Sequence, residues 1–106
     1  MQMKSKKKIS QILQEARQLL IDEGWCQGVG VNAAGEYCVV GAVNHILVEN
    51  KEDVINQLAW DTKEFLKLLV KDDLLTIWND MKDRTKAEVL EVLDTATSMA
   101  MSEENV

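Results

Sequence analysis

The chain has 106 residues, of which 46% are hydrophobic and 28% are charged, as in ordinary globular proteins. Its net charge of −6 makes nucleic acid an unfavourable partner, because an acidic body repels phosphates. No apolar run reaches the ~18 residues that a membrane-spanning helix requires, so a soluble, cytoplasmic protein is expected.

The first predicted element is an amphipathic helix from about Ser5 to Ile21. Apolar residues recur there at spacings of three and four, which is one face of a helix. Gly24 suits the left-handed conformation that closes a helix. Trp25 would then fold back onto the helix end.

A small β-hairpin is predicted next. Short segments at 28–31 and 36–39 flank residues 32–35, whose sequence Asn-Ala-Ala-Gly is typical of a tight turn. A four-residue turn would place Val29, and not Cys26, opposite Cys38. The predicted register therefore argues against a disulfide between the two cysteines.

Helices are predicted for the rest of the chain. The dense apolar pattern from Val39 to Val48 indicates a buried second helix, which a homodimer could also help to cover. Asn50 and Asp53 form a capping pattern that predicts the start of a third helix, and 65–70 predicts a fourth. Residues 74–78 fit either a helical turn or an extended piece.

The last predicted helix begins at a capping box, formed by Thr85 and Glu88, and its apolar positions continue to Ala100. The predicted fold is thus mainly α, with four to five helices and a small β-hairpin inserted after the first: an α+β single domain. That domain would span residues 1–106, with flexible ends at 1–5 and 102–106.

Cys38, Cys26 and His45 are the candidates for catalysis. Cys38 is predicted at a helix N-terminus, where the dipole can lower a thiol pKa, and Gly41 nearby permits close approach of a backbone or a ligand. Free cysteine is more often a buried apolar group. Cys38 and His45 lie seven residues apart on one helix, about 10.5 Å along its axis, and cannot touch.

Cys26 would therefore have to supply the nucleophile in any dyad with His45. The same three residues lack the paired spacing of a zinc site. No metal and no cofactor is expected.

The sequence Trp78-Asn79-Asp80 is the candidate for binding. An aromatic residue beside two hydrogen-bonding side chains in a loop is a common lining of pockets. In the structural alternative, Trp78 fills the core while Asn79 and Asp80 bond to backbone amides close in sequence.

Four short motifs occur in order along the chain: G-W-C-Q-G at 24–28, C-x-x-G-A at 38–42, W-N-D at 78–80 and R-T-x-x-E-V at 84–89. Together they resemble a family of small uncharacterised proteins of bacteria and phages. The resemblance implies a bacterial or phage origin and no mechanism. It singles out one possible binding cluster, in which Asp80 could pair with Arg84 and hold its loop beside the hairpin: Trp25, Gln27, Trp78, Asn79, Asp80 and Arg84.

We therefore expect a non-enzymatic binding or interaction protein that uses the hairpin and the W-N-D loop. Its partner would be an unidentified protein or small molecule, and a regulatory or host-modulating role would be consistent with a phage. The alternative is a hydrolase or transferase with Cys38 or Cys26 as nucleophile and Asp80 or Asn79 orienting a base.

Overall fold

The computed structural model describes residues 8–105, which fold into five α-helices. Three of them are long: α1 (Ile9–Glu23), α3 (Gln57–Val70) and α5 (Lys86–Glu104). The other two are α2 (Val39–Glu49) and the short α4 (Leu75–Asn79). None of the helices in this described part is long and apolar enough to cross a membrane.

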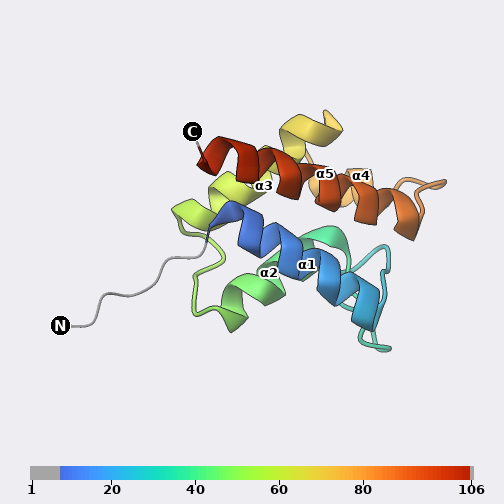
Figure 1. Ribbon diagram of the computed structural model, residues 1–106. Coiled ribbons are helices and arrows are strands. Elements are labelled where there is room, and N and C mark those ends of the chain that lie inside the picture. Colours follow the sequence, from blue (N-terminus) through green and yellow to red (C-terminus); the bar gives the residue numbers. More distant parts are fainter. Residues whose placement is uncertain (1–7, 106) are drawn as a thin grey trace.

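Helices α1 and α5 form the centre of the fold. They lie side by side and run in opposite directions (Figure 1), and the backbone N–H and the hydroxyl of Ser10 at the start of α1 donate to Glu104 at the end of α5. The apolar stripe of α1 packs inward as its periodicity predicts. Fully buried side chains from both helices share one core with those of α2 and α3, among them Leu13, Leu47, Leu66 and Leu93.

The predicted capping box of α5, formed by Thr85 and Glu88, is confirmed. Gly24 ends α1 where predicted, with a φ of 107°, and its N–H donates to the carbonyl of Leu20. Its ψ of 162° places it outside the left-handed helical conformation that was expected. Helix α5 continues to Glu104, through residues expected to form a flexible end. Residues 1–5, the other predicted flexible end, lie outside the described range.

The predicted β-hairpin is wrong: residues 24–38 form a loop without strands, so the fold is helical only. Two isolated bridges join Trp25 and Val31 separately to Tyr37. The tight turn itself exists, since the side-chain oxygen of Asn32 accepts from the N–H groups of Ala34 and Glu36. Two features prevent a ladder: Gly28 bends the chain with a φ of 89°, and helix α2 begins directly after Cys38.

The predicted register is also wrong by one residue. Val31 faces Tyr37, and the N–H of Cys38 donates to the carbonyl of Gly30 rather than facing Val29. The cause is the pairing of Asn32 with Glu36: the N–H of Asn32 donates to the carbonyl of Glu36, so three residues turn between them instead of the predicted four. Both cysteines are buried and free.

The start of α3 differs from the prediction as well. Asn50 ends α2 rather than opening a helix, and Asn56 caps α3 through its side chain. The two segments expected on either side of Asp61 form one continuous helix. Residues 74–78, left open between a helical turn and an extended piece, are helical: Leu74 is the N-cap of the short helix α4, which spans Leu75–Asn79.

Candidate functional site

Asn79 fastens the loop 24–38 to helix α4. Its side chain is fully buried and makes four hydrogen bonds. The oxygen accepts from the indole N–H of Trp25 at 2.7 Å and from the N–H of Val39 at 3.0 Å, while the amide nitrogen donates to the carbonyl of Cys26 and to Asp80. One side chain therefore ties the beginning of the loop and the start of α2 to α4.

Gln27 and Asp80 add a second row of bonds between the loop and α4. The amide of Gln27 donates to the carbonyls of Asn79 and Met81, at 3.0 and 2.9 Å. Asp80 accepts from the N–H of Gly28 at 2.9 Å. A helix of five residues cannot satisfy its own terminal carbonyls. Gln27 of the loop therefore caps the end of α4, and the same bonds hold the loop in place.

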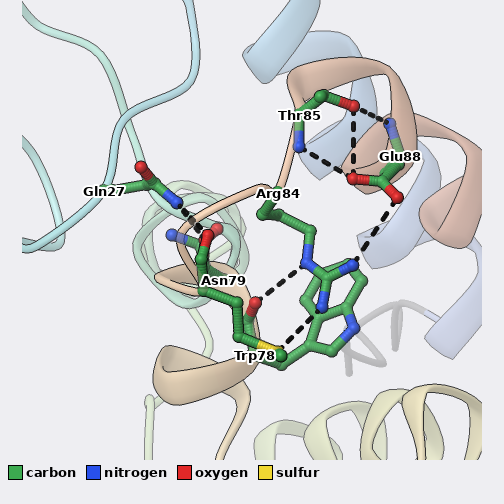
Figure 2. A network of polar contacts seen from close by, with 7 residues as sticks. Gln27, Trp78, Asn79, Arg84, Thr85 and Glu88 are labelled. Atoms are coloured by element: carbon green, nitrogen blue, oxygen red, sulfur yellow. Dashed lines mark hydrogen bonds and ion pairs between the residues drawn. The ribbon is translucent and has the colours of Figure 1, made fainter.

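Arg84 supports α4 from the other side, as Figure 2 shows. Its guanidinium lies 4.1 Å from the centre of the Trp78 ring and donates to the Trp78 carbonyl. It also reaches the capping box of α5, with a nitrogen 3.8 Å from the Glu88 carboxylate. The four motifs thus meet in one network that links the loop, α2, α4 and α5.

The contacts of Trp78, Asn79 and Asp80 agree only in part with the structural alternative described above. Trp78 is buried in the core, as the structural alternative expected. Asn79 does not bond mainly to its sequence neighbours, because three of its four partners lie 40 to 54 residues away. Asp80 bonds to the loop and Arg84 pairs with Glu88, so the suggested pair of Asp80 with Arg84 is not how the structure holds this loop.

Gly41 brings the loop against α2. A Cβ on this glycine would overlap the carbonyl of Gly30, and that carbonyl accepts from the N–H of Cys38 at 3.0 Å. Gly41 was expected to permit a close approach, and the approaching group is the Gly30 backbone. Gly30 and Gly41 both line two neighbouring clefts.

The first, here called the valine cleft, has a volume of about 330 Å³ and a mainly apolar lining: Gly30, Val31, Tyr37, Gly41, Asn44, His45 and Val48. The second, here called the Asp80 cleft, has about 200 Å³ and lies toward α4. Its lining includes Val29, Cys38, Val40, Asn44, Thr76 and Asp80. Both clefts open beside exposed valines of the loop.

The thiol of Cys26 is poorly suited to nucleophilic chemistry. It is buried and donates to the carbonyl of Glu36 at 3.2 Å. Burial, followed by the neighbouring Cys38 and Glu36, raises the pKa of this thiol, which disfavours the reactive thiolate. Cys38 is also buried, and its sulfur accepts from the N–H of Gly41 as the cap of α2.

His45 lies on α2, is partly exposed, and takes no part in the hydrogen bonds of either cysteine. Its ring nitrogens contact the hydroxyl of Tyr37 at 3.4 Å and the carboxylate of Glu49 at 3.3 Å. No bond within residues 8–105 joins it to Cys26 or Cys38. Nor does any group of three or more His, Cys, Asp or Glu in that range form a metal site.

A family of unknown function, DUF6197, matches residues 4–99. The chain belongs to this family. Comparison with curated proteins and with solved structures finds no match. Because DUF6197 carries no assigned activity, the function of the chain has to be argued from its site.

Sequence reasoning missed Val31, Tyr37, Asn44 and Val48 as parts of one surface. The signals were present but weak: Asn44 is a polar residue in a dense apolar run, and Val31 neighbours the predicted turn. Their meeting depends on the contact of Gly30 with Gly41, which local patterns do not reveal.

Proposed function

We propose that this DUF6197 chain is a binding protein without catalytic chemistry of its own. Its binding surface is the outer side of loop 24–38 together with the exposed face of α2. The observation that carries the proposal is the division of labour in the loop: the polar side chains of Asn79, Gln27 and Asp80 hold it from α4, while Val29 and Val31 point outward beside two clefts.

Such a surface is preorganised for binding. A loop of fifteen residues without strands would lose conformational entropy on binding if it were free to move, and here hydrogen bonds from α4 fix it in advance. Exposed apolar side chains around a cleft are the usual features of binding surfaces.

The predicted site residues change their role in this proposal. Trp25, Gln27, Trp78, Asn79, Asp80 and Arg84 support the surface, and the contact side chains are Val31 and Val48, 52% and 62% exposed. The expected bacterial or phage origin, cytoplasmic location and regulatory role stay part of this proposal.

The cysteine-nucleophile alternative has less support. It requires an accessible thiol with a lowered pKa near a base. Cys26 and Cys38 are both buried, and burial raises the pKa of the Cys26 thiol.

The proposal is tested by comparing what two doubly substituted proteins retain from a cell lysate. Val31→Asp with Val48→Asp puts charge on the proposed surface, whereas Ile55→Asp with Leu68→Asp does so at apolar sites that are 84% and 77% exposed elsewhere. All four positions are exposed, so both proteins should keep the helical circular dichroism of the parent.

Quantitative mass spectrometry of the captured proteins and small molecules gives the readout. We expect at least one species that the parent and the Ile55/Leu68 protein retain and the Val31/Val48 protein loses at least tenfold. Equal retention of every species by the two variants would refute this location for the binding surface.

A further inference from the structure

The valine cleft has one feature that folding alone does not explain: the side chain of Asn44. Its Oδ1 is buried and has no hydrogen-bond partner within residues 8–105. A buried polar atom without a partner destabilises a fold, and an apolar side chain of the same shape avoids that cost. Asn44 also lines both clefts. No hydrogen bond within the described residues uses the Asn44 amide nitrogen, and that nitrogen is not buried, so it is the atom that a ligand in the cleft could reach.

Resting on the function proposed above, we propose that the valine cleft binds a small, uncharged, mainly apolar molecule that carries an amide or a similar hydrogen-bonding group. The apolar body would contact Val31, Val48 and the ring of Tyr37. The polar group would accept a hydrogen bond from the amide nitrogen of Asn44, because the Oδ1 is buried out of reach of a ligand.

The electrostatics of the rim argue against an anion. Glu49 lies beside the cleft, 3.3 Å from His45, and the protein carries a net charge of −6. A negatively charged ligand would meet like charge in a mainly apolar cleft, where the cost of losing water is high. An uncharged ligand avoids both penalties.

The size of the valine cleft favours a compact ligand over an extended peptide. The volume of about 330 Å³ lies near the lower end of the ~300 to 1,000 Å³ usual for small-molecule sites.

Three probes of similar size test the proposal by titration monitored with amide NMR spectra: benzamide, benzoate and fluorobenzene. Benzamide has the proposed amide, benzoate replaces it with a charge, and fluorobenzene has neither. We expect benzamide to shift signals of residues 30–48 and to bind about fivefold or more tightly than the others, the factor given by one hydrogen bond of ordinary net strength.

Two variants assign the effect to the cleft. Asn44→Leu removes the unpartnered amide at nearly constant shape, so it should raise the melting temperature while abolishing the preference for benzamide over fluorobenzene. Val48→Asp, at an exposed position, should weaken all three probes with the fold intact. Ile55→Asp is the control and should bind benzamide like the parent.

Absence of benzamide shifts at residues 30–48, equal binding of benzamide and benzoate, or an unchanged preference in Asn44→Leu would each overturn the proposal. Its failure is separable from failure of the binding surface. Suppose that the Val31/Val48 protein loses a captured protein, while benzamide neither shifts signals of residues 30–48 nor displaces that protein from the parent. The binding surface then stands, and the small-molecule ligand is refuted.

Discussion

At the scale of single residues, Asn79 is the side chain on which the loop depends. A buried amide is stable only when its hydrogen-bonding capacity is met, and Asn79 meets it with Trp25, Val39, Cys26 and Asp80. The neighbouring Trp78 contributes packing instead, under the guanidinium of Arg84. The W-N-D motif thus combines a core anchor, a buried polar junction and a surface acceptor.

Asn79→Ala should destabilise the protein by about 3 kcal/mol. The substitution leaves the indole N–H of Trp25, the N–H of Val39 and the carbonyl of Cys26 without their partner, and each buried group left unpaired costs ~1 to 3 kcal/mol. Urea unfolding followed by circular dichroism measures the change. Asn105→Ala, at the exposed end of α5, should stay within about 0.5 kcal/mol of the parent; equal effects of the two substitutions would contradict the role of Asn79.

At the scale of the element, the loop packs on α2 through two facing glycines, Gly30 and Gly41. Replacing one or the other should affect stability differently. Gly41 lies inside a helix, where alanine would ordinarily stabilise by ~1 kcal/mol. Its Cβ would however overlap the Gly30 carbonyl, and that carbonyl is held by the N–H of Cys38. The backbone cannot yield without losing this bond.

Gly41→Ala should therefore destabilise the protein by about 2 kcal/mol, because overpacking against backbone typically costs ~1 to 3 kcal/mol and outweighs the gain in helix propensity. Gly30→Ala is the matched control: its Cβ would lie 3.9 Å from the Cα of Gly41, an ordinary contact. We expect a change of less than about 0.5 kcal/mol for Gly30→Ala. Thermal and urea unfolding of both proteins decide the point, and the reverse order would show that the loop does not rest on α2.

Elements with strong local signals could be predicted from the sequence, and those set by distant partners could not. The period of apolar residues located α1, α2 and α5, and Gly24 and Thr85 gave two of their ends. The hairpin failed because Tyr37 bridges to two segments and α2 starts directly after Cys38. The start of α3 failed because Asn50, Asp53 and Asn56 all fit a cap.

The candidate site shows the same limit. The motif resemblance assembled Gln27, Asn79, Asp80 and Arg84 into one cluster, and the structure does bring them together. Their roles were not predictable, because Asn79 owes its burial to partners 40 to 54 residues away. Asn44 and Val48 escaped notice because their surface exists only where the loop meets α2.

At the scale of the whole molecule, the two ends of the described chain hold each other. The first N–H groups of α1 have no acceptors within their own helix, and the Glu104 carboxylate at the end of α5 accepts from the N–H and the hydroxyl of Ser10, at 3.2 and 2.6 Å. The antiparallel helix pair at the centre of the fold is thereby closed at this end (Figure 1).

Glu104→Ala should lower the free energy of unfolding by about 1 to 2 kcal/mol, because hydrogen bonds to a charged group contribute ~1.5 to 3 kcal/mol and this one is partly exposed. Glu103→Ala removes the same charge at an exposed neighbouring position and should change stability by less than about 0.5 kcal/mol. Urea unfolding gives both values, and hydrogen exchange locates the effect in the first turn of α1. Equal values for the two variants, or unchanged exchange in that turn, would show that general charge and not the bond to Ser10 accounts for the contribution of Glu104.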